Sequence, residues 1–165
     1  MITALATQER RATPIPSFQT KVKVYQQGVH VHLFGINEEQ QIISALILKR
    51  ADNGLHGIVS GKMKHGETIL TAAYRETHEE TGLIPLALFD TGKRFSIQCN
   101  KYEFHVSVFS GLIPHNSPIK LNYENTDYTY VPTVFSPCHI EIIEQRKNQI
   151  FCINKVREMY QAMMN

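Results

Sequence analysis

The chain has few cysteines, no long apolar segment and little net charge. It contains three cysteines, none of them in a Cys-x-x-Cys pair, which favours isolated thiols over a zinc site or a disulfide framework. No apolar run reaches the roughly 18 residues that a membrane-spanning helix needs. The formal net charge of +2, with 19% charged residues, gives no general attraction to nucleic acids or membranes. An anionic ligand would therefore have to be bound by a local site.

The length and the N-terminal segment bear on domain organisation. A chain of 165 residues is long enough for one domain with a substantial core. Residues 1–20 lack the apolar run of about 7 to 15 residues that a secretory signal contains, and Pro14 and Pro16 favour a loose segment. We expect a flexible leader over residues 1–20 and a single domain over residues 21–165, located in a reducing cytoplasm.

The pattern of apolar residues predicts several strands and two helices. The strands are expected over residues 22–34, 42–48, 86–91, 94–98 and 102–110, with a short one near Ile58, and a closing helix over residues 140–163. Another helix is expected between Thr68 and Gly82. Helices that flank a mixed sheet indicate an α/β fold of the α/β/α sandwich type.

The most informative segment is an acidic stretch in the middle of the chain. Glu76, Glu79 and Glu80 stand at positions i, i+3 and i+4, which places them on one face of a helix. At about 100° per residue they fit within an arc of about 100°, and no basic residue falls inside it. A hard divalent cation would relieve their repulsion, because carboxylate oxygens suit Mg²⁺ or Mn²⁺ and Mg²⁺ is usually shared with substrate phosphates. The spacing therefore indicates metal-assisted chemistry on a phosphate ester or anhydride.

Both ends of this helix are marked in the sequence. Thr68 is a suitable N-cap, and Gly82 suits a left-handed position after the last turn, with Pro85 beyond it. The expected packing stripe consists of Ile69, Leu70, Ala73 and Thr77. Small side chains at Ala72 and Ala73 would let the helix lie close to whatever is beneath it and hold the carboxylates rigidly.

The segment resembles the Nudix box, written G-x5-E-x7-R-E-U-x-E-E-x-G-U, where U is a bulky aliphatic residue. All seven fixed positions match, at Gly61, Glu67, Arg75, Glu76, Glu79, Glu80 and Gly82. A chance match has odds on the order of 10⁻⁸ per starting position. Thr77 at the first U position is a mild departure that can still pack through its methyl group.

This resemblance implies a hydrolase of diphosphates linked to a second moiety, which uses Mg²⁺ or Mn²⁺ and has the α/β/α sandwich fold. Glu79 and Glu80 would ligate the metal, and Glu76 would be either a ligand or the base that activates water. The backbone carbonyl near Ser60 or Gly61 would complete the metal shell.

Arg75 and Glu67 would form a supporting ion pair that orients the glutamates. The resemblance thus implies that Arg75 and Glu67 position the glutamates and do not contact the substrate.

Two departures from the commonest family pattern narrow the expected substrate. Val59-Ser60-Gly61 stands where many relatives have Pro-Gly-Gly, and this version resembles the branch with dihydroneopterin triphosphate and dATP pyrophosphohydrolases. The segment from Glu124 to Val131 is similar to the Glu-His-x-x-Tyr-x-Trp-Leu stretch of that branch, with Asn125 for His and Tyr130 for Trp. Glu124 would then be an additional metal ligand or an alternative base. As a polar turn residue it would need no such role.

Two further features remain. Gln145 and Arg146 stand where relatives often carry a Gln-Arg pair at the start of the last helix. His30 and His32 alternate on one face of a predicted strand and could bind a metal, although such histidines more often make ordinary hydrogen bonds.

We therefore expect a metal-dependent pyrophosphohydrolase that uses metal-activated water to cleave a phosphoanhydride bond in a nucleoside triphosphate or a pterin triphosphate. Its partner would be a small diphosphate-containing molecule, with no specific nucleic acid and no membrane, and the sequence specifies no oligomeric state. The alternatives are a dinucleoside polyphosphate or nucleotide-sugar hydrolase, and a non-catalytic nucleotide-sensing module. The complete set of Glu76, Glu79 and Glu80 argues against the last, because a sensor need not keep all three.

Overall fold

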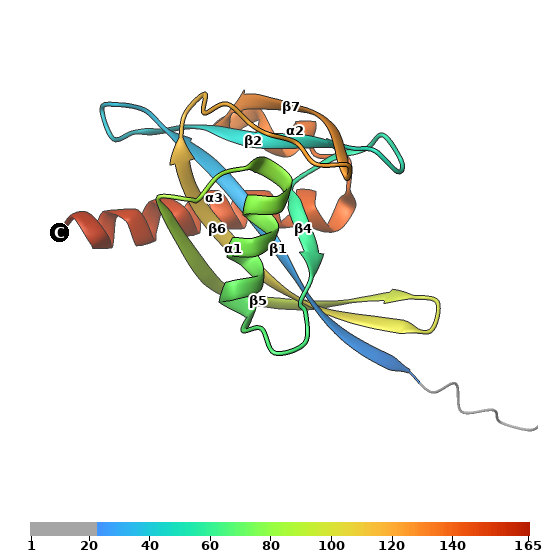
Figure 1. The fold of residues 1–165 in the computed structure, drawn as a ribbon. Coiled ribbons are helices and arrows are strands. Elements are labelled where there is room, and N and C mark those ends of the chain that lie inside the picture. Colours follow the sequence, from blue (N-terminus) through green and yellow to red (C-terminus); the bar gives the residue numbers. More distant parts are fainter. Residues whose placement is uncertain (1–22) are drawn as a thin grey trace, which may run out of the picture.

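One mixed sheet of seven strands forms the centre of the computed structural model, which describes residues 23–165 (Figure 1). The strands are β1 (Val24–Ile36), β2 (Ile42–Arg50), β3 (His56–Gly57), β4 (Val59–Lys62), β5 (Ala87–Cys99), β6 (Tyr102–Pro114) and β7 (Asn125–Pro132). Five follow the order β3-β2-β1-β6-β5, while β4 pairs with β1 and β7 with β2. Strands β1 and β6 are parallel and the other pairs are antiparallel. The expected leader, residues 1–20, lies outside the described residues.

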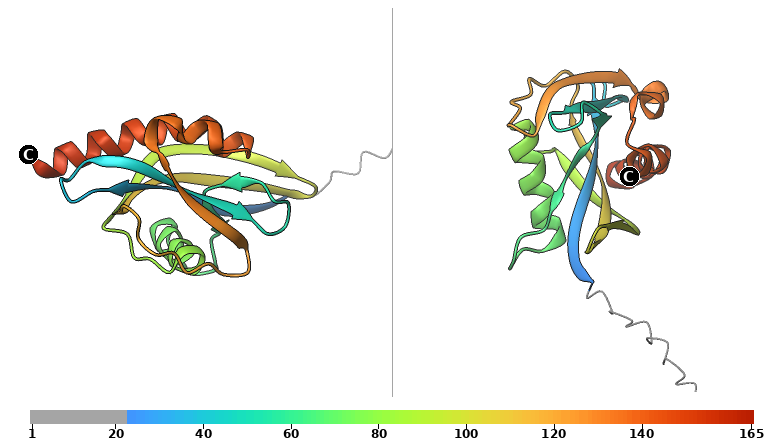
Figure 2. Two further views of the ribbon diagram at one scale, coloured as in Figure 1. Left: turned by 90° about the horizontal axis from the view of Figure 1, so that it is seen from above. Right: turned by 90° about the vertical axis from the view of Figure 1, so that its right-hand side faces the viewer.

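Helices cover both faces of this sheet. They are α1 (Ile69–Thr81), α2 (Ser136–His139) and α3 (Ile143–Met164), with a short 3₁₀ helix, η1 (Thr133–Phe135), before α2. The two views in Figure 2 show α1 on one side of the sheet and α3 on the other. The expected α/β/α sandwich is therefore confirmed. No helix within residues 23–165 is both long enough and apolar enough to cross a membrane.

The ends of α1 form as the sequence predicts. Thr68 has an extended backbone, and its side chain accepts a 3.1 Å hydrogen bond from the N–H of Thr71, which satisfies one free donor of the first turn. Gly82 takes a left-handed φ of 74°, and its N–H donates to the carbonyl of His78 at 2.8 Å. The helix is thus fixed in length between two caps.

The buried face of α1 differs slightly from the predicted stripe. Ala72, Ala73 and Thr77 are fully buried, so the small residues do allow close packing on the sheet. Leu70, however, is 47% exposed, and its expected packing role is wrong. The reason is that the face of α1 that packs on the sheet includes Glu76 and Glu80 and excludes Leu70.

The predicted strands 86–91 and 94–98 are a single strand, β5. Its pairing with β6 is irregular between Asp90 and Arg94, and Gly92 takes a left-handed φ of 79° there. Such a bulge interrupts the alternation of side chains, which explains why the sequence pattern divides the strand.

Two other boundaries need correction. The closing helix begins at Ile143 rather than Ile140, because Ile140 is extended, with φ −89° and ψ 120°, and separates α2 from α3. Residues 125–132, for which the pattern predicts no strand, form β7 against β2. Most side chains of β7 are exposed, so its apolar alternation is weak.

His30 and His32 are buried on β1. Burial lowers the pKa of His30 to about 3 and that of His32 to about 4, so both rings are neutral at pH 7. Nδ1 of His32 is hydrogen-bonded to the side-chain oxygen of Gln149 on α3. In the described part of the chain, no cluster of three metal-ligand side chains includes either histidine.

Gln145 forms a hydrogen bond that links the start of α3 to the chain between β3 and β4. It is buried, and its Oε1 accepts a 2.8 Å hydrogen bond from the N–H of Ile58. A Cβ at Gly57 would lie 2.3 Å from the same oxygen, so the glycine makes room for the contact. This hydrogen bond therefore joins α3 to the segment between β3 and β4.

Replacing Gln145 by leucine should lower the free energy of unfolding by about 1–3 kcal/mol, because the buried N–H of Ile58 loses its acceptor. Urea denaturation followed by circular dichroism measures the change. Arg146→Ala is the matched control, since Arg146 is exposed and its replacement should change that free energy by less than about 0.5 kcal/mol. Equal stabilities of the two variants would show that this hydrogen bond does not anchor α3.

Candidate active site

The site begins where β4 passes α1. Gly61 on β4 pairs with Val29 of β1, and a Cβ at Gly61 would lie 2.0 Å from Cδ of Glu76. Any larger residue would therefore displace the Glu76 carboxylate. The φ angle of Gly61 is not positive, so the motif needs this glycine for space and not for backbone conformation.

Glu80 is the most deeply buried carboxylate of the site, with 1% of its surface exposed. Its Oε2 accepts a 3.1 Å hydrogen bond from the N–H of Ser60, and its Oε1 accepts one of 2.9 Å from Nδ2 of Asn125. Burial, helped by the nearby charges of Glu124 and Glu76, raises the pKa of Glu80 to about 8. A cation beside this carboxylate would restore its ionised form.

The side chain of Glu124 approaches the Glu80 carboxylate from outside the helix. It directly precedes β7, and its carbonyl accepts a 2.8 Å hydrogen bond from the N–H of Ala51. Its own N–H donates to Oδ1 of Asn122 at 3.1 Å. The main chain of Glu124 is thus held, whereas its carboxylate has no hydrogen-bond donor among residues 23–165.

Carboxylate oxygens of Glu76, Glu80 and Glu124 lie within 4.8 Å of one another, and we call these residues the three-carboxylate cluster. Burial raises the pKa of Glu76 as well, although Arg75 opposes the shift. Closely spaced, poorly solvated carboxylates that offer only hard oxygen donors fit a divalent cation such as Mg²⁺ or Mn²⁺. The residues present therefore suit a metal site.

The two candidate backbone ligands on β4 point in different directions. The N–H of Ser60 points at Glu80, and in an antiparallel ladder the N–H and C=O of one residue lie on the same edge of the strand. The carbonyl of Gly61 lies on the β1 side, 3.0 Å from where a Cβ of Gly28 would be. Of the two predicted carbonyls, that of Ser60 is therefore the one on the side of the acidic residues, and its ligation of a metal stays a prediction.

Arg75 holds the acidic side chains in place with every arm of its guanidinium. Nε and Nη2 donate to Glu67 at 2.5 and 3.0 Å, and Nη1 donates to Glu76 at 2.8 Å and to Glu79 at 3.1 Å. Nη2 also donates to the carbonyl of Lys62 at 2.8 Å. The hydrogen bonds from Arg75 to Glu67, together with one from the N–H of Lys64, lower the pKa of Glu67 to about 2. The predicted pairing of Arg75 with Glu67 is present, and Arg75 also reaches two of the three motif glutamates.

Glu79 lies beside the three-carboxylate cluster and not within it. Its side chain is 40% exposed, and it pairs with Arg75 at 3.1 Å and with Lys64 at 3.7 Å. On the helix, Glu79 and Glu80 are turned to opposite sides of Glu76, by about 60° and 40°. Because Glu124 approaches Glu80, the cluster forms on that side, and metal ligation by Glu79 stays a prediction.

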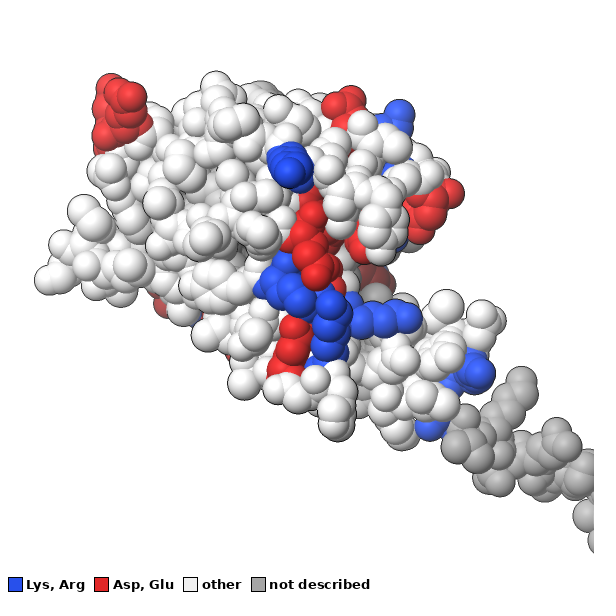
Figure 3. Space-filling view, in the orientation of Figure 1, with Lys and Arg blue, Asp and Glu red and all other residues white. Residues whose placement is uncertain are grey.

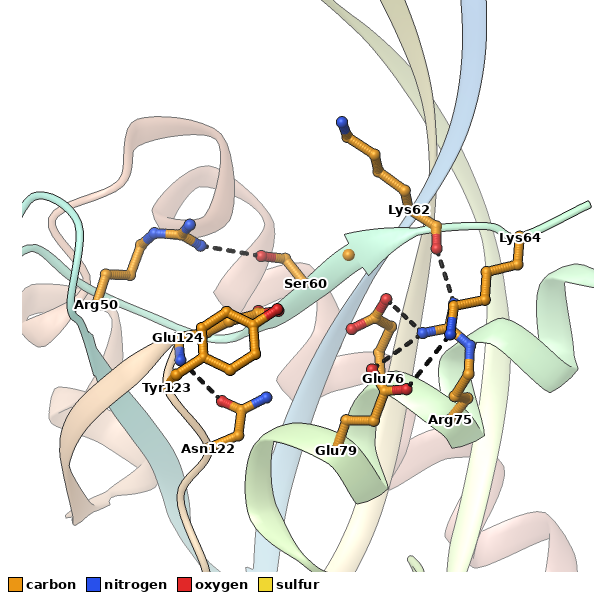
Figure 4. A pocket seen from close by; sticks show the side chains of 11 residues that line it. Arg50, Ser60, Lys62, Lys64, Arg75, Glu76, Glu79, Asn122, Tyr123 and Glu124 are labelled. Atoms are coloured by element: carbon orange, nitrogen blue, oxygen red, sulfur yellow. Dashed lines mark hydrogen bonds and ion pairs between the residues drawn. The ribbon is translucent and has the colours of Figure 1, made fainter.

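Of the acidic side chains described above, Glu76, Glu79 and Glu124 line one hollow of about 740 Å³, which we call the catalytic cavity, whereas Glu80 is buried outside its lining. Its lining consists of Arg50, Ser60, Gly61, Lys62, Lys64, Arg75, Glu76, Glu79, Asn122, Tyr123 and Glu124. Figure 4 shows Arg50 and Tyr123 on one side, Arg75 and Lys64 on the other, and Glu76 between them. In Figure 3 acidic and basic side chains adjoin in the middle of an otherwise largely neutral face. A phosphate ligand would meet charges of both signs there.

The sequence motif contains the acidic residues on one side of this cavity but neither Arg50 nor Tyr123 on the opposite side. Arg50, at the end of β2, donates to Asp52 at 3.0 and 3.1 Å and lies 3.4 Å from Oγ of Ser60. Tyr123 lies one residue before Glu124. Neither belongs to a motif, and only the neighbourhood of Glu124 could have drawn attention to Tyr123.

Comparison with known families gives one clear match. The model of the NUDIX domain family matches residues 26–125, which is more than half of the chain. No curated protein sequence matches it significantly.

Solved structures share the fold at low sequence identity. The Escherichia coli dihydroneopterin triphosphate pyrophosphohydrolase is 22% identical with a TM-score of 0.67, over 80% of this chain and 99% of that chain. A Caenorhabditis elegans Ap4A hydrolase is 15% identical with a TM-score of 0.61, over 84% and 98%. The NUDIX domain of Shewanella oneidensis NrtR, solved with ADP ribose, is 16% identical with a TM-score of 0.63, over 87% and 94%.

The family match covers the motif, most of β1, strands β2 to β6 and the three-carboxylate cluster. It confirms the family and the enzyme class that the motif predicts. The chain belongs to the NUDIX domain family and is a Nudix hydrolase, an enzyme that acts on phosphorus-containing acid anhydrides.

Proposed function

We propose that the chain is a metal-dependent pyrophosphohydrolase that cleaves a phosphoanhydride bond of a nucleoside triphosphate or a pterin triphosphate. The observation that carries this proposal is the convergence of Glu76, Glu80 and Glu124 within 4.8 Å, beside a cavity of about 740 Å³. A divalent cation bound there would offset charge on phosphate oxygens and lower the pKa of a bound water. Similarity to a dihydroneopterin triphosphate pyrophosphohydrolase supports the choice of a triphosphate.

The side chains of the cluster have different freedom, which suggests different roles. Glu80 is fixed by Ser60 and Asn125, and Glu76 is fixed by Arg75, so these two are suited to holding a cation in one place. Glu124 has no donor on its carboxylate within residues 23–165 and is free to take a proton from attacking water. We therefore assign Glu124 as the general base, while Arg75 acts only by positioning.

One alternative enzyme would use the same cavity. A dinucleoside polyphosphate or nucleotide-sugar hydrolase is supported by similarity to an Ap4A hydrolase. The predicted alternative of a non-catalytic nucleotide-sensing module is not retained, because the chain is a Nudix hydrolase, although it shares the fold of the NrtR domain solved with ADP ribose. A turnover panel of triphosphates, dinucleotides and nucleotide sugars with Mg²⁺ separates the two hydrolase activities. The flexible leader over residues 1–20 and the cytoplasmic location stay predictions.

Removing metal should abolish hydrolysis. EDTA is expected to stop turnover of the best triphosphate in the panel, and added Mg²⁺ or Mn²⁺ should restore it, because a divalent cation bound at the cluster would offset the phosphate charge. Pyrophosphate release measured before and after dialysis tests this. Full activity in metal-free buffer would refute the proposed chemistry.

The metal affinity should also rise with pH. In the metal-free protein Glu80, with a pKa of about 8, keeps its proton below pH 8, so a bound cation must displace it. The apparent affinity for Mn²⁺, measured by calorimetry, should therefore increase from pH 6 to pH 8 by up to about tenfold per pH unit. A flat profile over this range would contradict displacement of that proton.

Glu124→Gln should lower kcat by about 10²- to 10⁴-fold with little change in KM, because a general base acts in the transition state. Asp127→Asn is the matched control, since Asp127 is exposed and absent from the cavity lining. Its kcat and KM should stay within about threefold of the wild type. An unchanged kcat for Glu124→Gln would remove Glu124 from the mechanism and leave the metal site to Glu76 and Glu80.

A further inference from the structure

Tyr123 is the most exposed large apolar or aromatic side chain in the described part of the molecule, and it lines the catalytic cavity. Its surface is 86% exposed. The aromatic pairs within residues 23–165 are formed by other rings, and none includes Tyr123. An aromatic ring leaves a large apolar face in water unless something lies against it. A ligand in the cavity could cover that face.

The main chain that carries Tyr123 is fixed, although its ring is free. On one side, the carbonyl of Glu124 is bonded to the N–H of Ala51, and the N–H of Glu124 to Asn122. Next along the chain, buried Asn125 donates to Glu80. The Cα of Tyr123 therefore keeps a constant position relative to the three-carboxylate cluster, one residue away from Glu124.

Arg50 gives the same side of the cavity a second flat group (Figure 4). Its guanidinium is held by two hydrogen bonds to Asp52 and lies 3.4 Å from Oγ of Ser60. An immobilised guanidinium can stack on a planar ring or donate to it without further loss of side-chain freedom. Arg75, on the opposite side, is fully engaged by carboxylates and a carbonyl, so this flat pair has no counterpart there.

We propose that Tyr123 is a stacking platform for a planar heterocycle, a nucleobase or a pterin, whose phosphate chain extends to the three-carboxylate cluster, with Arg50 beside the ring. The proposal rests on the proposed function and assigns its substrate class through the ring. Stacking on an aromatic side chain tolerates different bases, because every base presents a π face. The site therefore selects for a flat ring and accepts several nucleoside triphosphates as well as pterin triphosphate.

Steady-state kinetics of Tyr123→Ala test this, with Tyr123→Phe as the conservative variant. For a nucleoside triphosphate, Tyr123→Ala should raise KM about tenfold with kcat within about twofold, and Tyr123→Phe should behave as the wild type. Inorganic triphosphate, which has no ring, should inhibit the wild type and Tyr123→Ala equally. Equal KM values for Tyr123→Ala and the wild type would overturn the proposal and leave the hydrolase intact.

Tyr128→Ala is the matched control. Tyr128 is also partly exposed and lies five residues further along, but it lines a separate small hollow with Lys49 and His56. Its removal should leave KM for the nucleoside triphosphate unchanged. A rise in KM as large as that of Tyr123→Ala would show a general effect on β7 and would contradict a specific platform at Tyr123.

A binding arm separates failure of this inference from failure of the proposed hydrolysis. Guanosine monophosphate and neopterin monophosphate are titrated into the wild type and into Tyr123→Ala by calorimetry, which needs no turnover. Weaker binding to Tyr123→Ala, by about tenfold, supports the platform even if no triphosphate is cleaved, and the relative affinities show whether a base or a pterin is preferred. Equal binding to both proteins, or no binding of either compound to the wild type, would overturn it.

Discussion

The site depends on the hydrogen bonds that the guanidinium of Arg75 donates. The guanidinium joins the loop at Glu67, the helix at Glu76 and Glu79, and the end of β4 at Lys62 through five hydrogen bonds. This network holds the helix and β4 at a fixed separation, and that separation is small enough that only glycine fits at position 61. Because all its donors are engaged, Arg75 is not available to bind substrate, which must find its cationic partners elsewhere in the cavity.

Burial of the Glu80 carboxylate beside Glu76 and Glu124 destabilises its ionised form, and a bound cation would offset this destabilisation. Glu80 is buried beside two other carboxylates, and its pKa of about 8 means that its ionised form is poorly stabilised by the protein alone. Hydrogen bonds from Ser60 and Asn125 compensate only in part. Functional sites commonly keep such destabilising groups in place through the surrounding structure. Here the rigid helix α1 and the paired strands supply that support.

Within α1, the sequence predicts the structure well, because helical periodicity and caps are local. The caps at Thr68 and Gly82 and the shared direction of Glu76 and Glu80 follow from spacing alone. The opposite wall depends on pairing between β2 and β7, which are far apart in the chain. No local pattern could therefore place Arg50 or Tyr123, and Glu124 could be suggested only by resemblance. The sequence pattern does not predict the bulge in β5 or the break before α3 for a related reason, since both interrupt the periodicity of the apolar residues.

The most direct test of the metal site is anomalous diffraction from crystals grown with Mn²⁺ at pH 8. We expect one anomalous peak within about 2.0 to 2.6 Å of carboxylate oxygens of Glu76 and Glu80, with the Ser60 carbonyl and the carboxylate of Glu124 nearby. A peak bound by Glu79 alone, or no peak at the three-carboxylate cluster under these conditions, would contradict the assignment of this cluster as the metal site of the enzyme.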